Sequence, residues 1–150
     1  MSTTKQPVVN RASLTSASLA TLAAATYCVS SNKDNTANNP LDVVVELSAT
    51  TTNTPIGNKQ VVLFCQASYD GGTTWQSGPT SGTTTTSEPN LTWLGTLLLP
   101  TASGAESKSF SVAAGYGFLP PMVRFVTKND LGVALTAGTL FTEEVTSTTV

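Results

Sequence analysis

The chain has 150 residues, a net charge of −2 at pH 7 and an isoelectric point near 4.9, and only 11% of its residues are charged. This length suits one domain, and its 7 lysines and arginines are scattered without a basic patch, which argues against nucleic-acid binding. Histidine is absent, which removes His-based acid–base catalysis, Ser-His-Asp and Cys-His nucleophiles and nearly all catalytic zinc sites, so we expect no enzyme, no metal and no cofactor.

Two further features bear on where the chain works. No apolar run reaches the roughly 18 residues needed to cross a bilayer, so we expect no membrane association. The N-terminus lacks the order of charged, apolar and small residues that marks a signal peptide, which predicts an unprocessed chain made inside the cell. In that setting Cys28 and Cys65 are expected to be small, buried apolar residues, with a disulfide between them as the alternative.

Taken in chain order, residues 1–25 come first and are small, polar and sparsely charged. They have too little hydrophobic mass for a core of their own, so we expect an extended N-terminal arm, with a short helix as an alternative near its end. The domain is expected to span residues 26–150. Within it, a turn-rich loop ends at Pro40, and apolar residues then alternate with polar ones from Leu41 to Ser48, which predicts a half-buried strand.

The same two signals, alternation and turn clusters, recur along the rest of the chain. They predict further strands at residues 59–69, 91–100, 107–116, 122–129 and 133–145. With the extended residues that precede the first loop, this makes roughly eight short strands and no amphipathic helix. The pattern predicts an all-β fold, a single antiparallel β-sandwich of jelly-roll or immunoglobulin-like type, and leaves the strand order open.

The segment SYDGGTTW has the spacing S-x-D-x-G-x-x-W, which resembles the Asp-box that recurs in sialidases. We interpret Ser68, Asp70, Gly72 and Trp75 as a structural hairpin. The Asp70 carboxylate is expected to accept N–H groups of its own turn, Gly72 to supply a positive φ, and Trp75 to fold back beneath the turn. The alternative is a sugar-contacting loop, in which Trp75 is the candidate glycan contact.

The acidic residues and Trp93 are the other candidates for sugar chemistry. A glycosidase needs two carboxylates placed together. Glu143 and Glu144 are adjacent, so in a strand they face opposite ways, and Asp42 and Glu46 would share a face at about 13 Å. These acids therefore read as surface residues. Trp93 lies in an apolar strand run and is expected in the core or at an interface.

Two segments carry a resemblance that covers residues 30–145: NKQVVLFCQASYDGG at 58–72 and VRFVTKNDLGVALTAG at 123–138. In this layout the chain is similar to small virion structural proteins of tailed bacteriophages. The resemblance implies a β-sandwich or jelly-roll module that decorates or cements the capsid, located at the virion surface. Its implied partners are the major capsid protein and neighbouring copies of itself, as a trimer or dimer.

Two alternatives remain at this point, a carbohydrate-binding module and a structural part of the tail or collar. The low charge agrees with a life packed against neighbours, because a nearly uncharged surface suits a free monomer poorly. We further expect residues 1–25 to reach a neighbouring subunit.

Overall fold

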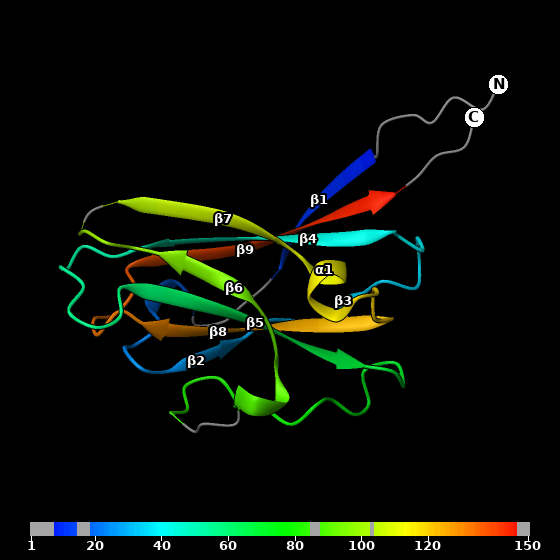
Figure 1. The fold of residues 1–150 in the computed structure, drawn as a ribbon, viewed down its shortest axis with the longest axis horizontal. Helices are drawn as coiled ribbons and strands as arrows, with labels where there is room; N and C mark the ends of the chain where they lie inside the picture. Colours follow the sequence, from blue (N-terminus) through cyan, green and yellow to red (C-terminus); the bar gives the residue numbers. More distant parts are fainter. Residues whose placement is uncertain (1–7, 15–18, 85–87, 103, 147–150) are drawn as a thin grey trace.

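A computed structural model describes residues 8–14, 19–84, 88–102 and 104–146. In these ranges the chain is almost entirely β-structure, with two antiparallel sheets packed face to face (Figure 1). The predicted all-β sandwich is therefore confirmed.

The first sheet has four strands, in the order β1 (Val8–Leu14), β9 (Ala137–Thr146), β4 (Asp42–Thr50) and β7 (Ala105–Ser111). The second sheet has the order β2 (Tyr27–Val29), β8 (Met122–Asp130), β5 (Gln60–Ser68) and β6 (Thr92–Leu98). A short strand, β3 (Lys33–Asp34), also pairs with β8. Three short helices complete the elements: η1 (Leu19–Thr21), η2 (Glu88–Asn90) and α1 (Val112–Tyr116).

The strand order distinguishes between the jelly-roll and the immunoglobulin-like type of β-sandwich. The pairs β5·β6, β4·β7, β2·β8 and β1·β9 are nested, so that the first half of the chain pairs in reverse with the second half. Two sheets built from a ribbon wrapped in this way are the jelly-roll arrangement. Of the two types that the sequence left open, the pairing agrees with the jelly roll.

The core lies between the sheets and is built from the inward faces of alternating strands. On β4, Val43, Val45 and Leu47 are fully buried, while every second residue between them is partly exposed. The alternation predicted for this strand is thus confirmed, although Leu41 precedes the strand and is 63% exposed. Cys28 and Cys65 lie in the same core and no disulfide joins them. Burial raises the pKa of the Cys65 thiol to about 12.

The N-terminal region differs from the predicted arm. Strand β1 pairs along its full length with β9, and Leu14, Leu19 and Leu22 are buried in the main core. Residues 8–14 and 19–25 of the expected arm are therefore part of the sandwich, because three leucines spaced among small polar residues supply apolar surface that packs in its core. Residues 1–7 and 15–18 of the predicted arm lie outside the described residues.

An ion-pair cluster on the outer face of the first sheet links β1 to β9 and β4. The Arg11 guanidinium donates to both carboxylate oxygens of Glu46, at 3.0 and 2.9 Å, and to Glu143 at 2.7 Å. It also lies 4.3 Å from the ring centre of Phe141. Glu144 faces the other way, is 6% exposed and pairs with Lys33. The two adjacent glutamates therefore lie on opposite faces, as the sequence predicted.

The long connection from β5 to β6 covers the outer face of the second sheet. Beneath it Tyr27, Val62, Phe64 and Val126 form a second apolar cluster. Residues 81–83 of the connection bond to the free edge of β2, where the backbone groups of Gly82 and Thr83 pair with Tyr27. Because both of its faces are covered, β5 is buried from Val61 to Ser68.

One predicted strand ends earlier than expected. The stretch 107–116 was predicted as strand, but after Ser111 the chain forms α1. The Ser111 side chain caps this helix by accepting the N–H of Ala114, and Gly117 closes it with a φ of 79°. Ser111 in turn donates to Asp42 at 2.5 Å, which ties the helix to the start of β4. These are the ordinary start and stop signals of a helix.

Candidate functional site

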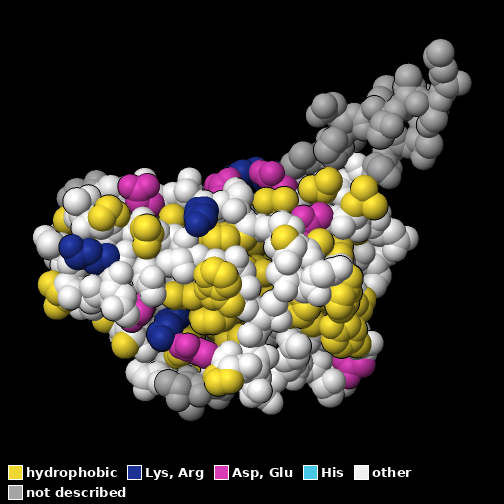
Figure 2. All heavy atoms as spheres, in the orientation of Figure 1, with side chains coloured by type: hydrophobic (Ala, Val, Ile, Leu, Met, Phe, Trp, Pro, Cys, Tyr) yellow, Lys and Arg dark blue, Asp and Glu magenta, His cyan; other side chains and the backbone are white. Residues whose placement is uncertain are grey.

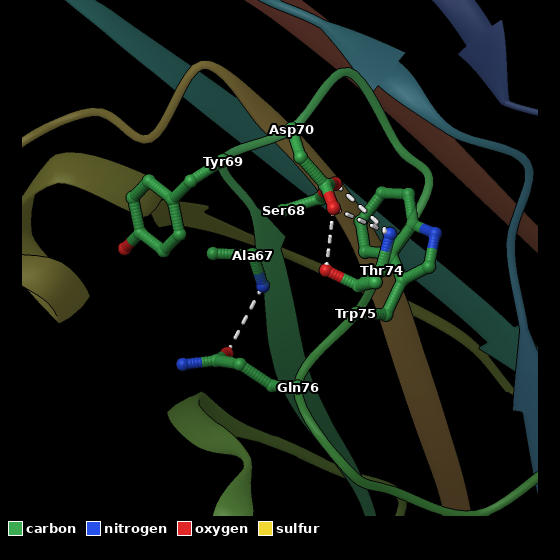
Figure 3. A pocket seen from close by; sticks show the side chains of 7 residues that line it. All are labelled: Ala67, Ser68, Tyr69, Asp70, Thr74, Trp75 and Gln76. Carbon is green, nitrogen blue, oxygen red and sulfur yellow. Dashed lines mark hydrogen bonds between the residues drawn. The ribbon is translucent and has the colours of Figure 1, made fainter.

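A shallow hollow of about 330 Å³ lies where β5 ends and the connection to β6 begins (Figure 3). It is lined by one continuous stretch of chain and its turn: Ala67, Ser68, Tyr69, Asp70, Thr74, Trp75 and Gln76. In Figure 3, Tyr69 stands on one side of Ala67 and the residues Thr74 and Trp75 stand on the other. The Asp-box residues therefore form one wall of this hollow.

The Asp70 carboxylate is fully engaged by its own turn. It accepts the Thr74 hydroxyl at 2.6 Å, the Thr74 N–H at 2.9 Å and the Thr73 N–H at 3.1 Å. The Ser68 hydroxyl donates to it at 2.8 Å and itself accepts the Gly72 N–H at 3.0 Å. A carboxylate with these donors has little acceptor capacity left for a ligand, so its role here is to shape the turn.

Trp75 folds back onto the same turn. Its indole N–H donates to the Gly72 carbonyl at 3.0 Å, and Gly72 has a φ of 85°, in the region that favours glycine. The Arg124 guanidinium lies 4.5 Å from the centre of the Trp75 ring. The indole therefore has its polar edge bonded and one face covered by a cation.

The turn is not the tip of a two-stranded hairpin. After Trp75 the chain leaves the sheet, and the strand that pairs with β5 on this side, β6, begins only at Thr92. Before it leaves, the Gln76 side chain accepts the Ala67 N–H at 3.0 Å and the Tyr116 hydroxyl at 2.9 Å. Gln76 thus closes the turn with its side chain and with one backbone bond, from its N–H to the Ala67 carbonyl at 3.4 Å.

Beneath the hollow lies a buried polar network on the outer face of β5. Gln66 is fully buried, donates to the Gln76 carbonyl at 2.7 Å and accepts from Arg124 at 2.8 Å. Because Arg124 also covers Trp75, this network connects the strand, the turn and the covering connection. The sequence pattern assigned Gln66 only to a strand face.

An aromatic group rises beside the hollow from a distant part of the chain. The rings of Tyr69 and Phe118 are 6.5 Å apart, and those of Phe118 and Tyr116 are 6.1 Å apart in an edge-to-face arrangement. Tyr69 is 60% exposed and Phe118 is 52% exposed. No sequence signal in the chain points to this group, because Tyr69 and the other two residues come from segments that only the fold brings together.

The remaining acids and Trp93 do not join this hollow. Asp42 and Glu46 each have structural partners, Ser111 and Arg11 respectively. Trp93 is 60% exposed on the edge strand β6, so of the two places expected for it, the core or an interface, the core is wrong. In the described ranges no three His, Cys, Asp or Glu side chains come together as metal ligands would.

We expect the turn to keep its hydrogen bonds to a lower pH than a turn held by an aspartate of ordinary pKa. Hydrogen bonds from the Thr74 hydroxyl, the Thr74 N–H and the Ser68 hydroxyl lower the pKa of Asp70 to about 2. Its pKa is lowered in the folded state, so its stabilising effect is complete above the unfolded pKa of about 3.9 and is lost as the pH falls toward 2. We therefore expect the amide signals of Thr73 and Thr74 in an NMR titration to move with a midpoint near pH 2.

The control for this titration is Asp70→Asn, which cannot ionise and should lose that transition. A midpoint for the Thr74 amide at about pH 3.9, the ordinary pKa of aspartate, would contradict the claim that the Asp70 carboxylate accepts all of these hydrogen bonds.

Comparison with known proteins adds no assignment. The chain matches no protein family, and no curated protein is significantly similar to it. Within the described part of the chain, no helix has the length and apolar character that a bilayer crossing requires.

Proposed function

We propose that this protein is a structural component of a tailed-bacteriophage virion, a decoration or cement protein that binds the major capsid protein and stabilises the head. The observation that carries the proposal is an edge strand that exposes large apolar side chains. Strand β6 ends the second sheet, and among the described strands its only sheet neighbour is β5. On it Trp93 is 60% exposed and Leu98 is 62% exposed.

The other sheet edges are protected in ways that β6 is not. Strand β7 carries Glu106 and Lys108, β1 carries Arg11, and the edge of β2 is bonded by residues 81–83 of the connection. By contrast, residues 89–105, which include all of β6, contain no charged residue, and the charge that reaches the β6 backbone comes from β7, where Lys108 donates to the Thr96 carbonyl at 3.1 Å. An exposed edge without charge or proline in its paired stretch invites another chain to add to it, and proteins that stay monomeric avoid it.

The side chains on β6 are of the kind that anchor interfaces. Trp93 pairs in register with Phe64, and Leu98 pairs with Gln60, so both project on the outer face of the sheet. Figure 2 shows hydrophobic side chains gathered near the middle of the view, on the side of the molecule where β6 lies in front. Tryptophan is enriched at the energetic centres of interfaces, where burial of one large ring contributes much of the affinity. This surface supports a function that works through contact area.

The proposal is tested by binding to heads that lack this chain. We expect the double variant Trp93→Ser, Leu98→Ser to bind such heads at least about 100-fold more weakly than the wild type, because two central apolar anchors are lost. The matched control is Ile56→Ser, since Ile56 is 78% exposed and belongs to the β4–β5 loop, outside β6. Co-sedimentation across a concentration series gives the occupancy, and circular dichroism shows that each variant is folded.

Two results would overturn the proposal. One is full-affinity binding of the double variant to heads. The other is a wild-type chain that binds neither heads nor any other virion part; gold-labelled chain on tails or collars in electron micrographs would instead select the tail or collar alternative.

A further inference from the structure

The hollow beside Tyr69 has the features of a small ligand site, and none of the residues that line it belongs to β6. Its rim carries two aromatic side chains that the fold leaves exposed, Tyr69 at 60% and Phe118 at 52%. Exposed aromatic rings in contact at a concave site differ from scattered surface residues, because such sites pair apolar walls with a few fixed polar groups. The rings therefore call for a partner that has an apolar face.

The aromatic rim is held rigidly. Phe118 packs against Tyr116, whose hydroxyl oxygen lies within hydrogen-bond distance of two acceptors, the Cys65 carbonyl at 3.1 Å and the Gln76 side-chain oxygen at 2.9 Å. Tyr116 is thereby anchored to the central strand of the sheet. A platform that is already ordered loses little conformational entropy when a ligand packs on it, which favours binding by a small contact area.

The polar groups at the hollow suit a neutral ligand. The Asp70 carboxylate is occupied by donors of its own turn, and Arg124 is committed to Gln66 and the Trp75 ring. The Gln76 side-chain oxygen is bonded to the Ala67 N–H, and in Figure 3 its amide nitrogen points to the side on which Tyr69 lies. An amide donor, a phenol hydroxyl and an apolar ring face are thus presented together.

We propose that this hollow binds one neutral sugar unit of a surface glycan, with the C–H face of the pyranose ring on Tyr69 and its hydroxyl groups toward Gln76. A pyranose has one apolar face and a rim of hydroxyls, which matches an aromatic ring beside an amide donor. The volume of about 330 Å³ is at the small end of ligand pockets and suits a single ring, the rest of the glycan lying in solvent. A nucleic-acid strand fits poorly, because phosphate binding needs several cations, whereas the residues that line the hollow include none and Arg124 faces the Trp75 ring.

In this proposal the residue that contacts the glycan is Tyr69 rather than Trp75. Trp75 forms a wall of the hollow, but its N–H is bonded to Gly72 and Arg124 covers one ring face. The platform is Tyr69, supported by Phe118.

The test is a titration of the full chain, followed by the backbone amide spectrum, with glucose, galactose, N-acetylglucosamine, N-acetylneuraminic acid and adenosine. We expect at least one of the neutral sugars to shift the signals of residues 67–76 and Phe118, with millimolar affinity. Tyr69→Ala should weaken that binding at least about tenfold, and Phe118→Leu, which keeps the apolar bulk but removes the ring, should weaken it less. The Trp93→Ser, Leu98→Ser variant is the matched control and should bind the sugar unchanged.

Three outcomes would overturn the proposal: no sugar shifts these signals, the sugar response survives in Tyr69→Ala, or adenosine alone binds. If none of the sugars binds but capsid heads protect Tyr69 and Phe118, the aromatic rim is a protein contact instead. Head binding is measured separately, on β6 variants. A negative sugar titration therefore leaves the virion proposal unaffected, and a negative head-binding experiment leaves the sugar proposal unaffected.

Discussion

Replacing Gly95 by alanine is expected to lower the free energy of unfolding by about 2–4 kcal/mol. The added Cβ would lie 2.4 Å from Cε1 and 2.6 Å from Cδ1 of Phe110, far inside van der Waals contact. Phe110 is 7% exposed and belongs to the core, while Gly95 sits at an irregular register opposite Leu63. The Phe110 ring, which belongs to β7, therefore lies over Gly95 of β6 and closes this edge of the sandwich. A side chain at position 95 would force the ring out.

Urea denaturation followed by tryptophan fluorescence measures this effect. The control is Gly104→Ala, where the nearest atom is the flexible Glu106 carboxylate oxygen at 3.7 Å, and its stability should stay within about 0.5 kcal/mol of the wild type. The double variant Gly95→Ala, Phe110→Leu should recover part of the loss, because the smaller side chain leaves room for the new methyl group. A Gly95→Ala protein as stable as the wild type would contradict the close packing of β6 against β7.

Replacing Gln66 by leucine is expected to destabilise the fold by about 2–4 kcal/mol, although the side chains are similar in size. Gln66 is fully buried, and its loss leaves the Gln76 carbonyl and the Arg124 Nε–H without their partner at the base of the turn. Buried polar groups that lose their partners cost their full desolvation, which outweighs the gain from an apolar side chain. Arg124 should also lose its fixed position over Trp75, seen as a change in tryptophan fluorescence.

The matched control is Gln60→Leu on the same strand and the same face. Gln60 is partly exposed and makes a long bond of 3.3 Å to Asp130, so its replacement should cost less than about 1 kcal/mol. Equal losses for the two variants would show that the network under the turn contributes nothing beyond side-chain burial.

The two-sheet fold could be predicted because alternation is a local signal. On β4 the apolar residues recur at every second position, and that period fixes both the strand and its buried face. The outer face of β5 shows the limit of the argument. Val62, Phe64 and Gln66 are buried by an irregular connection, and a loop that covers a sheet leaves no period in the sequence.

The N-terminal strand and the short helix were missed for different reasons. Pairing of β1 with β9 joins the two ends of the chain, and nothing local in Val8–Leu14 specifies so distant a partner. The helix α1 did have a local signal, Ser111 before it and Gly117 after it, but its length of 5 residues is too short for a periodic pattern. The apolar alternation of Phe110 and Val112 therefore favoured a longer strand.

At the candidate site, the prediction succeeded where the interactions are local. The bonds of Asp70 all come from within a few residues, so spacing alone indicates them. The aromatic rim joins Tyr69 to Tyr116 and Phe118 across the fold, and no spacing rule reaches that far. The same holds for Trp93, whose exposure depends on β6 being an edge strand.

The central claim is that this jelly roll works by contact along β6. Hydrogen–deuterium exchange of the wild-type chain, free and bound to heads that lack it, tests this claim most directly. We predict that binding slows exchange at the amides of residues 92–98, because a partner then covers or extends the open edge. Unchanged exchange in β6 on fully occupied heads, with protection confined to other strands, would contradict the account.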